Sequence, residues 1–312
     1  MRVSTNMMFQ TGANRISDLN SALNKTMQQI STNRRVLTPA DDAVAAARAL
    51  DVSQSQAVNS QFATNRQNAD SSLMLTDSTL SNVTSLLQDV KTSIVAAGNG
   101  GYSDADRASI ATELSGRLDG LLGLANATDG AGNYLFSGFQ TTTQPFVKTA
   151  VGAQYQGDGG SRKLQVDSAR QIEISASGQQ IFQGDGTDSQ DVFKTLQTLI
   201  GVLKTPLPTD PITRPAAQAL LTQTLGDANS NIDKSLDNVL SVRASLGARM
   251  NEIDSLNDTG SARDIQYQKN IADLVGLDPV AAYSSLMQQQ ITLQAAQKAF
   301  VSASNLSLFQ FM

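Results

Sequence analysis

Few residues in this chain could do chemistry, because its 312 residues include no histidine and no cysteine. This composition excludes thiol nucleophiles, disulfides, cysteine–histidine zinc sites and catalytic triads built on histidine. Two acidic groups of residues remain as candidates for a chemical site. One is the adjacent pair Asp41 and Asp42, and the other is the glycine-rich segment 184–188.

Asp41 and Asp42 have the side chains of a carboxylate pair for acid–base or metal chemistry. Adjacent residues on a helix do not face each other, however, so these two would not converge on one substrate. Thr38 is a good N-cap, Pro39 suits the first helical position, and Asp41 follows the cap by three residues, as in a capping box. Acidic side chains are also stabilised at the positive start of a helix. We therefore interpret these four residues as a linker that starts a helix.

The segment 184–188 reads Gly-Asp-Gly-Thr-Asp and faintly resembles a calcium-binding loop. It lacks the alternating ligand positions and the closing glutamate of an EF-hand, so a plain turn is favoured. The chain also contains no Walker-type phosphate loop, no G-x-G-x-x-G and no G-x-S-x-G sequence. We expect no catalytic residue, no cofactor and no metal site, and therefore a protein that is not an enzyme.

The composition favours a thin helical bundle. Hydrophobic residues make up 40% of the chain, but aromatic residues make up only 5% and tryptophan is absent. Charged residues make up 16%, below the typical level of about 25%. The net charge of −5 argues against nucleic-acid binding, since proteins that bind nucleic acids are normally basic. The chain has no apolar stretch of about 18 residues and no signal-like start, so we expect no membrane insertion and no cleaved secretory signal.

The spacing of apolar residues predicts several long helices. We expect helices over about 5–33, 40–97, 103–128, 192–203 and 216–258, and a last one from about 279, with strand signals between about 134 and 183. In two of these helices apolar residues recur every seven positions, which predicts that the two pack against each other. These residues are Leu73, Leu80, Leu87 and Ile94 in the first, and Leu225, Ile232, Val239, Leu246 and Ile253 in the second.

Both ends of the chain carry apolar stripes, although protein termini are usually polar and frayed. After Gly276 the only charged residues are Asp278 and Lys298, and the polar positions are mostly amides and hydroxyls. A helix of this kind suits burial among identical helices, where repeated charges would repel one another. We expect it to become ordered on assembly, because a single helix of this composition is marginal. The expected assembly interface consists of Ile16, Leu19, Leu23, Ile30, Leu286, Leu293, Ala296, Phe300, Ala303, Leu306 and Phe309.

Several segments together resemble a known family. They are residues 1–5 (MRVST), 30–42 (ISTNRRVLTPADD), 134–140 (YLFSGFQ), 155–158 (YQGD), 243–251 (RASLGARMN) and 306–309 (LSLF). The chain resembles the bacterial flagellar hook-associated proteins of the third type, which are relatives of flagellin. Asn33 stands where glycine is usual in this family, and Ala43 stands where proline is usual.

The resemblance implies a mainly α fold, a flagellin-like long antiparallel helical bundle or coiled coil with paired terminal helices and a small β-rich insert. It implies three parts, two of them discontinuous. Residues 1–45 with 277–312 would form an inner terminal-helix domain, and residues 46–140 with 188–276 a middle helical bundle. Residues 141–187 would form a β-rich outer insert.

The resemblance also implies a structural role in the bacterial flagellum. The protein would leave the cell unfolded by type III export, held beforehand by an export chaperone. Outside the cell it would self-assemble into the junction layer between hook and filament. Its partners would be hook-associated protein 1, flagellin and copies of itself, with no nucleic acid and no membrane insertion.

Two other interpretations remain open. The chain could be flagellin itself, the filament subunit, although the segments 134–140 and 155–158 favour a junction protein. A cytoplasmic coiled-coil scaffold is a different class. That class predicts charged residues beside the apolar stripe, and the last helix has few of them.

Overall fold

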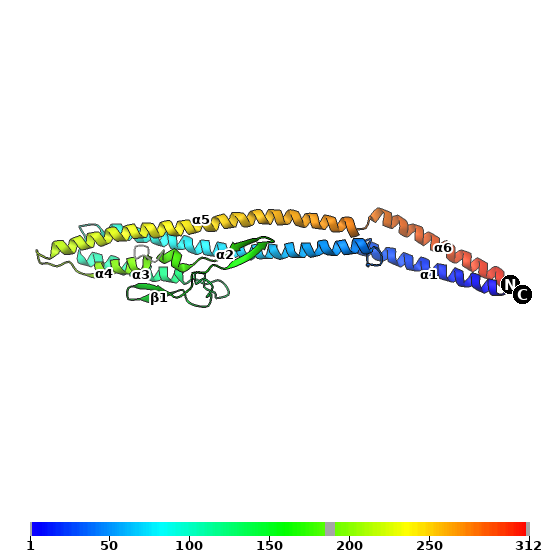
Figure 1. Cartoon of the computed structure of the whole chain (residues 1–312), viewed down its shortest axis with the longest axis horizontal. Helices are drawn as coiled ribbons and strands as arrows, with labels where there is room; N and C mark the ends of the chain where they lie inside the picture. Colours follow the sequence, from blue (N-terminus) through cyan, green and yellow to red (C-terminus); the bar gives the residue numbers. More distant parts are fainter. Residues whose placement is uncertain (1, 185–190, 310–312) are drawn as a thin grey trace. The chain divides into compact units, whose positions relative to one another are not determined.

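The computed structural model describes residues 2–184 and 191–309, with side chains for residues 7–303 inside those ranges. The described chain is mainly helical, with a small β-insert between the helices, which confirms the expected fold class (Figure 1). The helices are α1 (Arg2–Thr32), α2 (Ala43–Ala97), α3 (Asp104–Ala125), α4 (Val192–Lys204), α5 (Arg214–Val275) and α6 (Pro279–Phe309).

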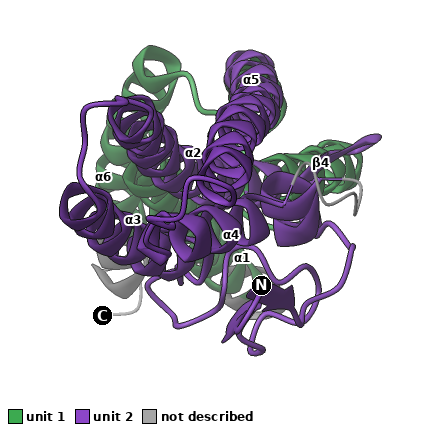
Figure 2. Ribbon diagram, turned by 90° about the vertical axis from the view of Figure 1, so that its left-hand side faces the viewer, with its two compact units in different colours: residues 1–60, 261–312 green, residues 61–260 purple. Residues whose placement is uncertain are grey.

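The chain divides into two compact units, which Figure 2 shows in different colours. Unit 1 comprises residues 1–60 and 261–312, and unit 2 comprises residues 61–260. Unit 1 is therefore made of two distant stretches of the chain, whereas unit 2 is continuous. The three-part division expected from the sequence is a finer one and is taken up under the proposed function.

Unit 2 is a bundle in which α2, α3, α4 and α5 share one apolar core with the insert. Leu80 of α2 and Val239 of α5 are fully buried, as are most of the seven-residue repeat positions. An ion pair joins the same two helices, since Nε of Arg243 lies 2.8 Å from Oδ1 of Asp77. The predicted pairing of the two apolar stripes is therefore confirmed.

The α3 helix begins with a capping box and packs along α4. Oγ of Ser103 accepts a hydrogen bond from the Asp106 N–H, and the Asp106 carboxylate accepts one from the Ser103 N–H. Two of the N–H groups left unpaired at a helix start are satisfied in this way. The short α4 begins at a simple N-cap, where the Asp191 carboxylate accepts from the Lys194 N–H.

The α5 helix runs much further than the sequence predicted. We expected an interruption at 258–260, yet α5 continues through Gly260 to Val275. A Cβ at position 260 would lie 2.4 Å from Nη2 of Arg66, so this glycine makes room for a side chain of α2. The expectation was wrong because glycine costs a helix only about 1 kcal/mol, which tertiary packing can offset.

The β-insert consists of two separate antiparallel hairpins. Strand β1 (Phe146–Thr149) pairs with β2 (Gly152–Tyr155), and β3 (Lys163–Asp167) pairs with β4 (Arg170–Glu173). A turn of π-helix, η1 (Gln179–Gln183), follows. The strand signal expected at 134–136 gives only an isolated bridge, because this segment is folded around side-chain contacts described below.

Rings fill the space between the insert and the bundle of unit 2. Phe146 of β1 lies with its ring centroid 5.4 Å from that of Phe182 and 5.0 Å from that of Phe193 at the start of α4. Phe136 meets Phe182 edge-on at 5.6 Å. All four rings are almost completely buried. The buried aromatic side chains of the described chain are therefore concentrated at this contact between the insert and the bundle.

In unit 1, α1 and α6 lie side by side and antiparallel (Figure 1). Phe9 and Phe300 meet edge-on, with ring centroids 5.8 Å apart. A backbone bridge between Arg34 and Gly276 joins the two connections that follow α1 and α5. Among the described residues, no helix has both the length and the hydropathy needed to cross a membrane.

Candidate assembly interface

The linker between α1 and α2 is organised around Asp41. Its Oδ2 accepts hydrogen bonds from the N–H groups of Leu37 and Thr38 at 3.0 and 2.9 Å, and Nζ of Lys25 lies 2.5 Å from its Oδ1. The Lys25 ammonium, followed by the Thr38 N–H, holds the pKa of Asp41 well below its usual range. The carboxylate is therefore a structural group that ties α1 to the turn, and not a general acid.

Asp42, and not Thr38, caps the second helix. We expected Thr38 at the cap and Pro39 as the first helical residue, but α2 begins at Ala43. Oδ1 of Asp42 accepts from the Ala45 N–H at 2.9 Å, which is the main reason that the pKa of Asp42 is lowered. Residues 38–41 form a separate turn instead, because Asp41 turns its carboxylate back to the N–H groups before it.

Arg35 joins this linker to the end of α5. Its N–H donates to the carbonyl of Val275 at 2.8 Å, and its guanidinium donates to the carbonyl of Leu274 at 2.9 Å and pairs with Asp42 at 3.5 Å. The same region contains a small buried apolar cluster of Val36, Ala45 and Val275. Asp41 and Asp42 therefore hold the two ends of this linker, Asp41 by bonds to Lys25 and Thr38 and Asp42 by bonds to Arg35 and Ala45.

The contact between α1 and α6 is here named the terminal seam, and the predicted assembly residues lie on these two helices. Leu293 is buried, and Ala303 is exposed. Leu306 and Phe309 lie in the last turns of α6, where the side chains are outside the described residues. The other members are half-buried: Ile16, Leu19, Leu23, Ile30, Leu286, Ala296 and Phe300.

Sequence reasoning missed two members of the seam, Phe9 and Gly12. The Phe300 ring rests on Gly12, where a Cβ would lie 2.8 Å from Cδ2 of that ring. Phe9, about one turn before Gly12 on α1, packs edge-on against the same Phe300 ring. The signal in the sequence was the spacing Phe9-x-x-Gly12-x-x-x-Ile16, which continues the apolar stripe towards the N-terminus.

A second apolar stripe on α6 was also missed, and it points away from α1. We name it the exposed α6 stripe, and its members are Val280, Tyr283, Met287 and Ile291, which are 80%, 55%, 60% and 68% exposed. Residues three and four apart share one face of a helix, so these four side chains form a continuous row. Its signal was the spacing of Val280, Tyr283, Met287 and Ile291, which places four apolar residues on one face of the helix. Grouped exposed apolar side chains mark protein interaction sites.

The two segments 134–140 and 155–158 form one structural clasp. Oδ1 of Asp158 accepts from the N–H groups of Phe139 and Gly160, both at 2.9 Å. The Tyr155 hydroxyl donates to the Phe136 carbonyl at 2.9 Å, and burial raises the pKa of this tyrosine. Gly138 has a φ of 74° and comes so close to Asp158 that a Cβ there would collide with it. These family-like residues therefore hold the insert together and carry no reactive group.

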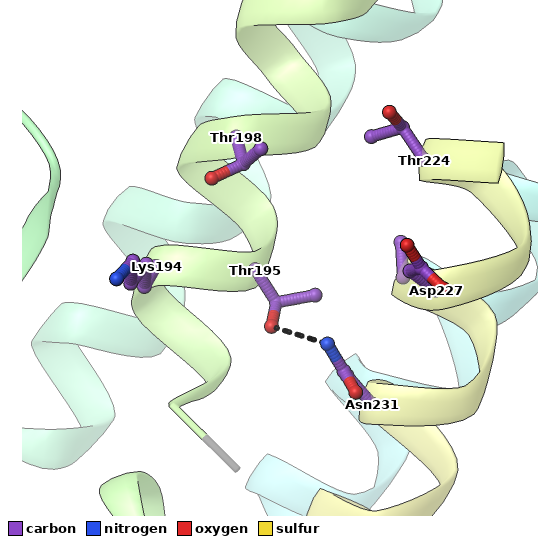
Figure 3. Close-up of a pocket in the computed structure, with 7 residues that line it drawn as sticks. Lys194, Thr195, Thr198, Thr224, Asp227 and Asn231 are labelled. Carbon is purple, nitrogen blue, oxygen red and sulfur yellow. Dashed lines mark hydrogen bonds between the residues drawn. The ribbon is translucent and has the colours of Figure 1, made fainter. Parts of the chain in front are cut away.

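A polar pocket lies between α4 and α5 in unit 2 (Figure 3). It has a volume of about 210 Å³ and is lined by three threonines together with Lys194, Asp227, Ala228 and Asn231. Thr195 accepts a hydrogen bond from Nδ2 of Asn231 at 3.5 Å, and Lys194 points away from α5. Within the described residues, this pocket offers no nucleophile that is hydrogen-bonded to a base.

The other candidate chemical site in the sequence is a metal-binding loop at the acidic segment 184–188. In the described part of the chain, no group of three or more acidic side chains could hold a metal ion. The acidic segment 184–188 lies outside the described residues except for Gly184, which has a φ of 65°. The described features that could bind a partner protein are the exposed apolar side chains of α6.

Comparisons with known proteins agree with this interpretation. The bacterial flagellin N-terminal helical region matches residues 3–141, and the bacterial flagellin C-terminal helical region matches residues 230–312. Flagellar hook-associated protein 3 of Escherichia coli is 41% identical over 320 residues, which cover 99% of each chain. The protein of the same name from Salmonella typhimurium is 40% identical, again over 99% of each chain.

A solved structure supports the fold. The flagellar junction protein of Legionella pneumophila matches with a TM-score of 0.60 and 20% identity, covering 73% of this chain and 100% of that chain. At this identity the likeness concerns the fold alone. The full-length matches at about 40% identity carry the assignment: the chain belongs to the flagellin family and, within it, to the flagellar hook-associated proteins of type 3.

Proposed function

We propose that this chain forms the layer of subunits that joins the flagellar hook to the flagellin filament. As a member of its family it is a structural flagellar protein and not an enzyme. On the hook side its partner is hook-associated protein 1, and on the filament side its partner is flagellin. Within the layer each copy contacts other copies of the same chain.

The observation that carries this proposal is the pair of apolar stripes on α6. One stripe lies in the terminal seam, where α1 covers Leu293 and Phe300. The other is the exposed α6 stripe, which no part of the described chain covers, with Val280 80% exposed. Fully burying one such side chain contributes roughly 1.5–3 kcal/mol, so a row of four can hold neighbouring subunits together.

The finer division of the chain follows from this role. Residues 1–45 and 277–312 form the inner layer, where uncharged helices of neighbouring copies pack together. Residues 46–140 and 188–276 form the middle layer, and residues 141–187 form the outer insert. Before assembly an export chaperone covers the last helix, because its exposed apolar residues would otherwise promote aggregation. The chain then passes unfolded through the type III export pathway.

Electron microscopy of a deletion strain tests this function, together with an immunoblot of the growth medium for flagellin. We expect hooks without filaments and unpolymerised flagellin in the medium, because flagellin would be exported but could not attach. Hooks without filaments and without exported flagellin would indicate flagellin itself. Normal filaments in the deletion strain would contradict the proposal.

A further inference from the structure

A large apolar side chain is presented to solvent on the loop between α4 and α5. Ile212 is 86% exposed, the highest value among the exposed large hydrophobic residues of the described chain. The loop is stiffened by Pro206, Pro208 and Pro211, each of which fixes one backbone angle. A rigid loop loses little conformational entropy on binding, so this loop is prepared for a contact.

Asp210 holds the tip of this loop. Its Oδ1 accepts from the Ile212 N–H at 3.2 Å, and its Oδ2 accepts from the Thr213 hydroxyl at 3.2 Å. Asp210 is exposed and lies directly beside Ile212 in this hydrogen-bonded turn. The tip of the loop in unit 2 therefore combines one apolar knob with one negative charge.

Unit 1 contains a pocket with the complementary character, which we name the linker pocket. It lies beside the linker between α1 and α2 and has a volume of about 210 Å³. This is below the range of about 300–1,000 Å³ that is usual for small-molecule sites, but it can hold an aliphatic side chain. Its apolar lining comes from the linker, α2 and α5: Val36, Leu37, Ala46, Ala49, Leu50 and Val275.

The linker pocket also has one positive charge at its edge, from Arg34. The nearby acids Asp41 and Asp42 are paired with Lys25 and Arg35 instead. In the part of the chain that the structure describes, no carboxylate lies within ion-pair distance of the Arg34 guanidinium. An apolar pocket beside an available guanidinium matches an aliphatic side chain with a carboxylate next to it.

We infer that Ile212 of one copy enters the linker pocket of another copy, where Asp210 pairs with Arg34. Ile212 is 86% exposed and Leu50 of the pocket is 69% exposed, so both are accessible to a second copy of the chain. A knob and a pocket on different surfaces of one molecule give a head-to-tail contact, which builds open helical arrays. The inference rests on the proposed function, since it assumes that copies of this chain assemble.

The absence of cysteine from this chain allows a direct cross-linking test. The double variant Leu50→Cys with Ile212→Cys is expressed in the deletion strain, and its flagella are treated with a short thiol-to-thiol cross-linker. We expect a ladder of linked copies, whereas each single-cysteine variant should remain monomeric on the gel. The matched control pairs Leu50→Cys with Val151→Cys, a residue that is 70% exposed on the β1–β2 turn, and should give no ladder.

Charge reversal provides a second test that does not depend on cross-linking geometry. Arg34→Asp and Asp210→Arg should each reduce the number of attached filaments several-fold, and the double reversal should restore it. As a control, Arg48→Asp changes another exposed charge on unit 1 and should not rescue Asp210→Arg. An immunoblot of the medium shows whether each variant is still exported, which separates assembly defects from export defects.

The outcomes separate this inference from the proposed function. Attached filaments with no ladder for the double-cysteine variant would overturn the inference and leave the junction role intact. Charge reversals that have no effect, or that are not restored in the double variant, would also overturn it. Normal filaments in the deletion strain would instead remove the proposed function on which the inference rests.

Discussion

Two glycines inside α5 differ in what surrounds them. A Cβ at Gly260 would lie 2.4 Å from Nη2 of Arg66, whereas a Cβ at Gly247 would meet no atom within 4 Å. Arg66 is buried, and its Nε and Nη1 donate to the Asn257 side chain and the Val166 carbonyl, so it cannot easily withdraw. Gly260 is therefore required by packing, and nothing in the described fold requires Gly247.

This contrast gives a paired prediction. Gly260→Ala should lower the free energy of unfolding by about 1–3 kcal/mol, as is usual when a packed site is overfilled. Gly247→Ala should raise it by about 0.5–1 kcal/mol, because alanine is the better helix former. Urea unfolding of the monomer, followed by circular dichroism, measures both. Equal effects of the two substitutions would mean that Arg66 moves freely and that the packing argument is wrong.

Asp41 makes the linker sensitive to acid. Hydrogen bonds from Lys25 and Thr38 lower its pKa in the folded state. A carboxylate with a lowered folded-state pKa stabilises the fold above its unfolded-state pKa of about 4, and this stabilisation is lost as the pH falls towards the folded-state value. We expect residues 33–42 to lose hydrogen-exchange protection below about pH 4, after correction for intrinsic exchange rates.

The variant Asp41→Asn is the control for this pH dependence. It removes the titrating group, so protection of the linker should already be low near neutral pH and should change less on acidification. Mass-spectrometric hydrogen exchange at about pH 6 and about pH 3 measures both proteins. A variant that shows the same acid transition as the natural chain would assign the sensitivity to another group, such as Asp42.

At the scale of whole helices, the two faces of α6 have different tasks. Leu293 is buried in the terminal seam, and Ile291 on the exposed α6 stripe is 68% exposed. Leu293→Asp would place a charge at a buried position of α6, and burying an unpaired charge is costly. Ile291→Asp would leave that buried position unchanged and would place a charge only in the proposed contact between copies.

We therefore expect both aspartate variants to abolish filament attachment, for different reasons. In the monomer, Leu293→Asp should increase hydrogen exchange in α1 and α6, whereas Ile291→Asp should not. Unit 2 should remain folded in both, which near-native helical content would show. Normal filament attachment by the Ile291→Asp strain would contradict the assignment of the exposed α6 stripe to contacts between copies.

Periodic patterns made the long helices predictable from the sequence. Leu80 and Val239 belong to seven-residue repeats, and both are fully buried where the two helices pack. The end of α5 was not predictable, because the space that Gly260 leaves is filled by Arg66, a residue nearly two hundred positions away in the sequence. Local sequence shows that glycine weakens a helix, but not what packs against it.

Only one of the two apolar stripes of α6 was predicted from the sequence, because only that stripe has a matching stripe elsewhere in the chain. The stripe with Leu293 stands out because it has a matching stripe near Ile16, and the structure brings the two helices together. The stripe with Ile291 has no such match within the chain, so helical periodicity alone did not reveal it. The start of α2 was predicted too early because Thr38 followed by Pro39 has the local pattern of a helix start. In the structure the Asp41 carboxylate accepts from the N–H groups of Leu37 and Thr38 instead, and Asp42 caps the helix.

At the scale of the whole molecule, the apolar core is distributed very unevenly. The main core extends from Ala69 to Ile253 and lies entirely within unit 2. Among the described residues of unit 1, the buried apolar cluster at the linker consists of Val36, Ala45 and Val275, and the terminal seam is mostly half-buried. A pair of helices that buries so little apolar area is marginally stable in water.

Limited proteolysis of the exported monomer should therefore remove the two ends of the chain first. We expect early cleavage within residues 1–60 and 261–312, and a resistant fragment close to residues 61–260. That fragment, expressed alone, should unfold cooperatively near the temperature of the full chain, because it contains the whole main core. In assembled flagella the same ends should resist the protease, since neighbouring copies would cover the exposed α6 stripe. Early cuts inside the bundle of unit 2, or ends that are equally protected in the free monomer, would show that unit 1 is stable by itself and needs no neighbours to become ordered.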